Sequence, residues 1–240
     1  MVRLYIDSHL DTGKLIELQE HQLHYLRNVL RLKMNDLVQL FNGQDGEWQG
    51  MLEICTKSKA VVLVQQCLRA PIVEATVTLL FAPLKQEAMH FLIEKTTELG
   101  VSCLQPVTTE FTQIHKLNME KMGRYCVDAA QQCERLSVPV MNPLQSLSDV
   151  LQTWSSNKIL IVCLERQESL PIASLLQQLD VMQEVAFLVG PEGGLSARDI
   201  ALLSTHSFVR FCRMGSRILR AETAAVAALA CFQSLRGDWT

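Results

Sequence analysis

The sequence predicts an α/β protein in which a mostly parallel sheet follows a smaller, β-rich N-terminal domain. Three observations lead to this fold class. From residue 76 onward, short apolar strand patterns alternate with amphipathic helix patterns, as expected where helices cover a parallel sheet. Before residue 70 the pattern is mainly that of β-strands. The chain has 240 residues, 48% of them hydrophobic, which is enough for two domains with sizeable cores.

The N-terminal region, residues 1–70, is expected to combine short strands with one helix. β-forming residues gather in LVQLFNG and KAVVLVQQ, and NGQDGEW supplies the turn residues that separate strands. The predicted helix is HQLHYLRNVLR, residues 21–31. We therefore expect a small β domain over 1–70 and a second domain over 76–240.

The helix predicted over 21–31 has two different faces. Leu23, Leu26 and Leu30 recur at helical spacing and form an apolar face directed at a core. Polar residues occupy the other face: His24, Arg27, Asn28 and Arg31. Behind this domain, LRAPIVEA predicts a linker, because Pro71 interrupts the strand pattern.

The second region reads as repeated strand–helix pairs. The predicted strands are VTLLFAP, CLQPVTT, VPVMNP, KILIVCLE, VAFLVG and FVRFCRMG. The predicted helices are KQEAMHFLIEKTTELG, LNMEKMGRYCVDAAQQCERL, SLSDVLQTW, PIASLLQQL, SARDIALLS and AETAAVAALACFQSL. Gly100 is placed to end the first of these helices as its C-terminal cap.

Composition limits the function classes. The net charge of −3 does not indicate a uniformly basic nucleic-acid binder, although a local basic patch is compatible with it. The eight cysteines include no C-x-x-C pair and no zinc spacing, so we expect reduced thiols and no metal. Neither a signal peptide nor an apolar run of about 18 residues occurs. We expect a soluble, cytoplasmic protein without membrane contact.

Two loops are unusual at positions where strands of the parallel sheet end, which is where open α/β sheets bind ligands. In the first, Gly190-Pro191-Glu192-Gly193-Gly194, glycines permit close approach of a ligand to the main chain. Ser196 and Asp199 fit a capping box that opens the next helix. A tight strand-to-helix turn would also account for this loop taken alone.

The second loop is RMGSRILRAET, residues 213–223. Arg217 and Arg220 flank two apolar residues, an arrangement suited to a flat base with anionic groups. Glu222 lies in the first turn of a helix, where a carboxylate also complements the helix dipole. The Walker A, dinucleotide-binding and nucleophile-elbow patterns do not occur in the sequence, so a phosphate cradle, a Rossmann site and a serine hydrolase are not indicated.

LVGPEGGLS followed by MGSRILRAETAA resembles the signature pair of the SPOUT-class methyltransferases, and more narrowly of the RsmE family. That family methylates N3 of a uridine in 16S ribosomal RNA. HYLRNVLR, FNGQDGEW, EKTTELGV and QQCERLSVP are similar to further family segments in the same order. Four residues differ from the usual family residue: Tyr25, Asn42, Ser137 and Ala221.

The resemblance implies a C-terminal domain with a trefoil knot, a PUA-like RNA-binding barrel at the N-terminus, and S-adenosylmethionine held by knotted backbone. The implied cofactor contacts are Leu164, Gly190, Glu192, Met214, Gly215, Ile218 and Leu219. It also implies a homodimer, formed through the last helix and the strand before it. Close helix packing within one chain would give the same alanine-rich pattern there.

For catalysis, we expect Arg220 or Arg217 to stabilise the anion that develops on the uracil. Glu222 is a candidate general base or orienting group, and Glu192 is a weaker candidate base. The expected RNA contacts are His24, Arg27, Asn28 and Arg31, with Arg3 and Lys33 near them. Two alternatives stay open: a SPOUT methyltransferase for another RNA, and a non-catalytic RNA-binding assembly factor.

Overall fold

The computed structural model describes residues 1–155, 157–164, 168–180 and 183–239. The chain divides into two compact units. The first unit contains residues 1–73 together with 130–138. The second contains residues 74–129 and 139–240.

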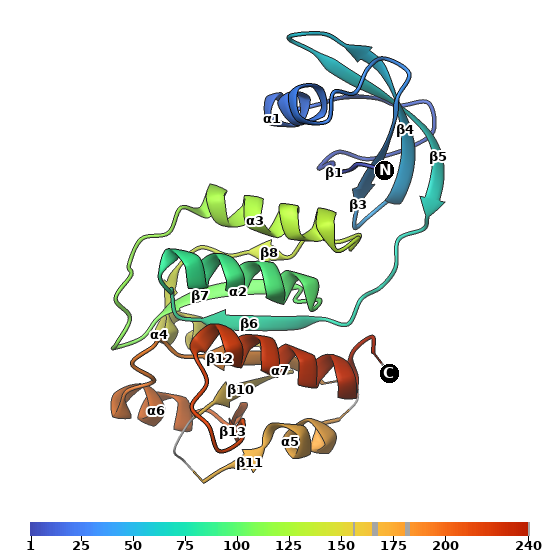
Figure 1. Ribbon diagram of the computed structural model, residues 1–240. Helices are drawn as coiled ribbons and strands as arrows, with labels where there is room; N and C mark the ends of the chain where they lie inside the picture. The colour runs from blue at the N-terminus through green and yellow to red at the C-terminus, as the bar shows by residue number, and fades with distance from the viewer. Residues whose placement is uncertain (156, 165–167, 181–182, 240) are drawn as a thin grey trace. The chain divides into compact units, whose positions relative to one another are not determined.

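The first unit is built on a five-stranded sheet with strand order β1-β3-β4-β5-β2 (Figure 1). Its strands are β1 Arg3–Tyr5, β2 Leu15–Glu17, β3 Leu37–Asn42, β4 Gly46–Cys55 and β5 Ala60–Arg69. β1 runs parallel to β3, and the other pairs are antiparallel. Alternating side chains of these strands enclose an apolar core, as expected for a sheet with one buried face.

The helical segment of the first unit differs from the single α-helix predicted over 21–31. An α-helix, α1 Glu20–His24, continues into a π-helical turn, η1 Tyr25–Val29, which closes with a hydrogen bond from the Leu30 amide to the Tyr25 carbonyl. Leu23 and Leu26 are buried as predicted, whereas Leu30 is 37% exposed. The wider π turn moves Leu30 away from the apolar face, and a 3.6-residue period cannot anticipate it.

Arg3 lies inside the first unit, contrary to the expectation that it contacts RNA. It is 7% exposed, and its guanidinium donates to the Glu47 carboxylate and to the backbone carbonyls of Ala130, Gln131 and Arg135. Arg69 donates to the second oxygen of Glu47 at 2.7 Å. Each of the three guanidinium nitrogens of Arg3 donates to a group within the unit, so the side chain is engaged there rather than presented to phosphate.

The second unit contains the parallel sheet that the sequence predicts. The strand order is β11-β13-β10-β12-β6-β7-β8, with β9 beside β7, and each of these neighbouring pairs is parallel. The strands are β6 Val77–Phe81, β7 Cys103–Thr108, β8 Val140–Met141, β9 Gln145–Ser146, β10 Lys158–Cys163, β11 Leu170–Pro171, β12 Glu184–Val189 and β13 Val209–Arg213.

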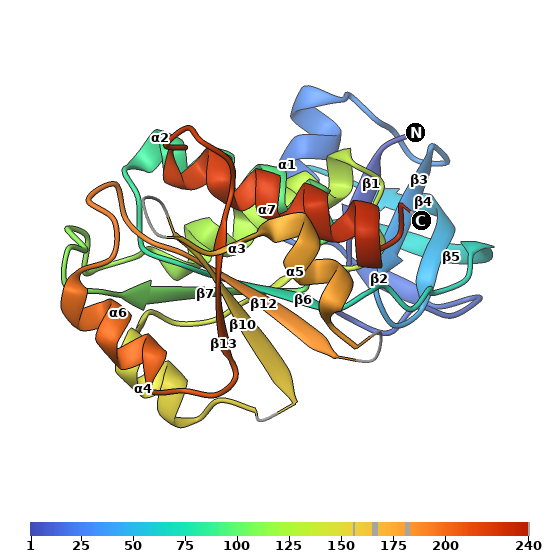
Figure 2. The same ribbon diagram turned by 90° about the horizontal axis from the view of Figure 1, so that it is seen from below.

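Helices cover both faces of this sheet. They are α2 Gln86–Glu98, α3 Met119–Gln132, α4 Leu147–Gln152, α5 Ile172–Gln178, α6 Ala197–Ser204 and α7 Ala221–Arg236. Figure 2 shows α2, α5 and α7 on one side of the sheet and α4 and α6 on the other. Leu188 of β12 packs into the cluster with α4 and α6, whereas the ring of its neighbour Phe187 meets Phe232 of α7 edge to face. This alternation explains the continuously apolar strands.

α7 packs against α2, α5 and β12. Ala224, Ala225 and Ala228 are buried in the single chain, so the row of small residues serves packing within it. Among the residues that the structure describes, no helix is long and apolar enough to cross a membrane. The predicted capping box of α6 is confirmed: Ser196 and Asp199 each accept from the other's backbone amide at 3.0 Å.

Candidate active site

A pocket of about 1340 Å³ opens at the carboxyl ends of β10, β12 and β13. These strands are neighbours in the sheet, and Cys163 at the end of β10 pairs with Cys212 of β13. The parallel arrangement therefore brings together the loops that follow the three strands, as in other open α/β sheets. The first turns of α2 and α7 complete the lining.

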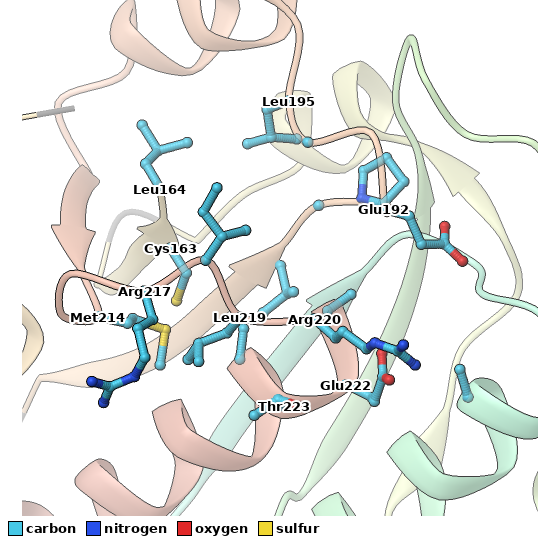
Figure 3. Close-up of a pocket in the computed structure, with 18 of the residues that line it drawn as sticks. Cys163, Leu164, Glu192, Leu195, Met214, Arg217, Leu219, Arg220, Glu222 and Thr223 are labelled. Carbon is cyan, nitrogen blue, oxygen red and sulfur yellow. The ribbon is translucent and has the colours of Figure 1, made fainter. Parts of the chain in front are cut away.

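Every residue predicted to bind the cofactor or to act in catalysis lines this pocket (Figure 3). They come from three strand ends and the start of α7. The predicted cofactor residues are Leu164, Gly190, Glu192, Met214, Gly215, Ile218 and Leu219, and the predicted catalytic residues are Arg217, Arg220 and Glu222. Segments far apart in the sequence thus form one site.

The loop after β12 folds into a tight turn. The Gly194 amide donates to the Pro191 carbonyl at 2.8 Å, and Gly194 has a left-handed φ of 76°. A Cβ atom added to Gly190 would lie 3.2 Å from the side chain of Leu195. The conformation at Gly194 therefore favours glycine, and a side chain at Gly190 would crowd Leu195. These two glycines bring main chain to the pocket, which Pro191 and Glu192 also line.

The loop after β13 offers main chain and apolar side chains. Gly215 has φ of 100°, and a Cβ atom added there would meet nothing within 4 Å. Ile218 is 56% exposed although it is apolar. Arg220 is the N-cap residue of α7, and its side chain makes no capping hydrogen bond, so the first amides of α7 have no side-chain cap.

The charged residues occupy different ends of the pocket. Figure 3 shows Glu192 and the side chains of Arg220 and Glu222 on one side, whereas Arg217 extends in the opposite direction beside Met214. Glu222 lies in the first turn of α7, where its carboxylate complements the helix dipole. The pocket therefore has one end that combines a guanidinium with two carboxylates.

Several lining residues were not predicted. Lys85, Glu87 and Phe91 reach the pocket from α2, and Phe91 is 44% exposed. Their contribution depends on the packing of α2 beside α7, for which the sequence carries no local signal. Cys163 also lines the pocket. Its hydrogen-bonding contact with the Cys212 thiol and its burial raise the pKa of the Cys163 thiol well above its ordinary value.

The predicted RNA-contacting face of the first unit is partly accessible. His24, Asn28, Arg31 and Lys33 are exposed, and Arg27 is half-buried. Arg31 follows the π-helical turn with a left-handed φ of 58°, a position that usually belongs to glycine. These polar residues belong to one short segment of the chain, residues 24–33. Arg3 does not belong to it.

Two protein-family models match the chain. Residues 72–233 match the RNA methyltransferase domain family, and residues 18–65 match the RNA methyltransferase PUA domain family. The ribosomal RNA small subunit methyltransferase E of Rickettsia conorii is 34% identical over 95% of this chain and 93% of its own. The protein of the same name from Synechocystis is 32% identical, over 92% of this chain and 73% of its own.

Solved structures are similar over the whole chain. The ribosomal RNA small subunit methyltransferase E of Neisseria gonorrhoeae, bound to S-adenosyl methionine, has a TM-score of 0.89 at 26% identity and covers 100% of both chains. A protein of Legionella pneumophila in complex with the same cofactor has a TM-score of 0.87 at 28% identity, over 99% of this chain and 98% of its own. The chain belongs to the ribosomal RNA small subunit methyltransferase E family of RNA methyltransferases.

Proposed function

We propose that the protein transfers a methyl group from S-adenosylmethionine to N3 of a uridine in the 16S RNA of the small ribosomal subunit. The single observation that carries this proposal is the convergence of the two glycine-containing loops on one pocket beside Arg220 and Glu222. A ribosomal substrate would be met in the cytoplasm. The threading of the chain as a trefoil knot is part of the same proposal.

The pocket suits S-adenosylmethionine. Gly190, Gly194 and Gly215 line the pocket without side chains, so main-chain groups of these loops can meet the edge of an adenine. Leu164 and Leu219 offer apolar contact to its faces. Pockets for one small molecule usually measure roughly 300–1,000 Å³, so a volume of about 1340 Å³ leaves room for part of a second ligand. When bound, the cofactor supplies a methyl group on a sulfonium, which needs no activation by the protein.

The chain's own residues must prepare the nucleobase. N3 of uracil carries a proton at neutral pH and is a poor nucleophile until the proton leaves. In this proposal Glu222 accepts the proton, with Glu192 as the second candidate, and a general base contributes about 10²–10⁴-fold. The Arg220 guanidinium stabilises the negative charge that develops on the uracil oxygens. Alignment of the reacting atoms supplies roughly 7–11 kcal/mol at best.

Arg217 is the alternative cationic donor. Its side chain extends away from Glu222, which favours Arg220 for the anion and leaves Arg217 for the RNA backbone or the cofactor (Figure 3).

In the first unit, His24, Arg27 and Arg31 are proposed to contact phosphates. We also propose that the protein forms a homodimer. Sedimentation of the purified protein measures its mass and so tests this directly.

The decisive experiment uses purified protein, radiolabelled S-adenosylmethionine and small ribosomal subunits that lack the modification. We expect label in 3-methyluridine, identified by mass after digestion of the RNA to nucleosides. Label in another nucleoside or only in another RNA would indicate a methyltransferase with a different substrate. Cofactor binding without transfer to any RNA would indicate a non-catalytic assembly factor.

The roles within the site are tested by kcat at saturating cofactor. Arg220→Ala and Glu222→Gln should each lower kcat with little change in cofactor affinity, because both groups act on the nucleobase. Arg217→Ala serves as the comparison: the arginine whose loss lowers kcat more is the cationic donor. An unchanged kcat in both Arg220→Ala and Glu222→Gln would end this assignment.

A further inference from the structure

An exposed aromatic ring lies against the glycine loop that borders the pocket. Phe111, in the segment after β7, is 47% exposed. A Cβ atom added to Gly193 would lie 3.4 Å from Phe111 Cβ and 3.8 Å from two atoms of its ring, so the Phe111 side chain lies against this loop. The residues on both sides of Gly193, Glu192 and Gly194, line the pocket. Phe111 therefore stands just outside the end of the pocket that holds Glu192.

The turn that carries Phe111 is tightly bonded. The Thr109 amide donates to Thr112 Oγ1 at 2.8 Å, and the Thr112 amide donates back to the Thr109 carbonyl at 3.1 Å. Both threonines are buried, at 8% and 6% exposure. The exposure of the Phe111 ring is thus not the result of a loose loop: a rigid turn holds the ring toward solvent.

A second set of hydrogen bonds fixes this turn to the far end of the glycine loop. The Glu110 amide donates to the two carboxylate oxygens of Asp199 at 3.4 and 3.3 Å. Asp199 is the buried residue of the α6 capping box, which Ser196 completes. Figure 2 shows the segment after β7 beside the start of α6. The ring and the pocket border are consequently held in one geometry.

We propose that Phe111 is a stacking platform for a nucleobase of the RNA substrate, at or next to the target nucleotide. This inference rests on the proposed function. A base must leave its stack before an enzyme can act on it, and aromatic side chains commonly replace the lost stacking. An exposed aromatic ring lacks the stabilisation that burial would give it, and a base stacked on the ring would bury it. A rigidly held ring at the border of a nucleotide-sized pocket suits this use.

The charges near Phe111 in the sequence indicate that its contact with RNA is not an ionic contact with phosphate. Along the segment, the negative charge of Glu110 offsets the positive charge of the exposed Lys116. The contact is therefore made by the ring face and not by charge. Lys116 lies on the same exposed segment as Phe111, and protein interfaces are poor in lysine, which favours RNA over a second protein chain as the occupant.

The test compares Phe111→Ala and Phe111→Leu, which remove the ring, with Phe111→Trp, which keeps one. With small ribosomal subunits as substrate, the first two should raise the KM for the subunit by about tenfold, the size typical of one lost base stack, while Phe111→Trp stays near the unaltered value. The dissociation constant for S-adenosylmethionine should not change in any of them. The slope of log affinity against log salt should also stay the same, because no phosphate contact is lost.

A matched control is Trp239→Ala. Trp239 is 58% exposed and follows α7 at its other end, roughly 24 Å of helix from the pocket. Its loss should leave the KM unchanged. As a spectroscopic check, the indole of Phe111→Trp should be quenched when a 16S RNA transcript is added, beyond any change in the unaltered protein.

Unchanged KM values in both Phe111→Ala and Phe111→Leu would overturn the proposal. So would a fall in the sedimenting mass of Phe111→Ala, which would assign the ring to a protein interface. If the unaltered protein methylates no RNA, the proposed function fails separately. The platform is then judged by direct binding of the 16S RNA transcript, where equal affinities of Phe111→Ala and the unaltered protein would refute it.

Discussion

The sulfur atoms of Cys163 and Cys212 lie 4.0 Å apart on the paired strands β10 and β13. Cys163 also lines the pocket proposed for the cofactor. The contact with Cys212 and burial raise the pKa of Cys163. A thiol with a raised pKa holds little thiolate at neutral pH and reacts slowly with electrophiles.

Iodoacetamide should therefore modify the exposed Cys67 well before Cys163 at pH 7. The rate at Cys163 should rise with pH as its thiolate forms, and saturating S-adenosylmethionine should slow it further by covering the pocket. Mass spectrometry of the two cysteine peptides over time measures both rates. Equal rates at pH 7 would contradict the environment described for Cys163.

Glu47→Gln should lower the free energy of unfolding by roughly 3–5 kcal/mol, because it leaves Arg3 buried without a carboxylate. Both side chains of the Arg3–Glu47 pair are 5% exposed. Glu17→Gln is the matched control. Glu17 pairs with Lys59 on the surface and should contribute about 0–1 kcal/mol. Denaturant titration, with hydrogen exchange in the strands of the first unit, measures both changes.

The same pair predicts a dependence on pH. Burial alone would raise the pKa of Glu47, but hydrogen bonds from Arg69 and Arg3 outweigh it and hold the pKa below its ordinary value of 4.5. A lowered folded-state pKa stabilises the protein fully above the unfolded value, and the stabilisation is lost as pH falls through the folded value. The difference in stability between the unaltered protein and Glu47→Gln should hence shrink below pH 4.5. A constant difference would be evidence against the ion pair.

Gly194→Ala should weaken binding of S-adenosylmethionine by about tenfold. The left-handed φ of 76° costs alanine about 1–2 kcal/mol, and the turn from Pro191 would relax to avoid it. Gly123→Ala is the control, because Gly123 lies within α3 and an added Cβ atom meets nothing within 4 Å. That change should stabilise the protein slightly and leave the cofactor affinity intact. Calorimetric titration measures both, and equal affinities would argue against the turn's role.

Arg31→Gly should weaken RNA binding without loss of stability, because glycine suits the left-handed φ of 58° better than arginine does. The slope of log affinity against log salt should fall by about one unit if one phosphate contact is lost. Lys57→Glu, at the exposed β4–β5 turn, is the control and should have a smaller effect. A salt slope that stays the same in Arg31→Gly would remove Arg31 from the RNA-contacting set.

Local sequence signals predicted those parts of the fold that depend on nearby residues. The apolar runs of β10 and β12 and the capping box of Ser196 and Asp199 depend on neighbours within a few positions, and the structure contains them. The two pocket loops were found for the same reason: glycines after an apolar strand mark a backbone that needs space. The two loops lie close together because parallel strands end at the same edge of the sheet.

Other features depend on partners distant in the sequence. From local sequence Arg3 resembles a surface cation. Its partners are Glu47, 44 residues later, and the carbonyls of Ala130, Gln131 and Arg135. The same limit applies to Phe91 and Phe111, whose positions at the pocket are set by helix packing and by a hydrogen bond to Asp199 across 89 residues. Prediction from hydrophobic spacing assumes a constant helical period of about 3.6 residues. The π-helical turn at 25–29 contains an extra residue and so departs from that period.

The most direct test of the central claim is hydrogen exchange at individual amides with and without S-adenosylmethionine. If exposed main chain at the ends of β12 and β13 holds the cofactor, its binding should slow exchange in residues 190–195 and 214–220, and leave the exposed β4–β5 turn unchanged. Cofactor binding without slower exchange in those two segments, or no binding of the cofactor, would contradict the account.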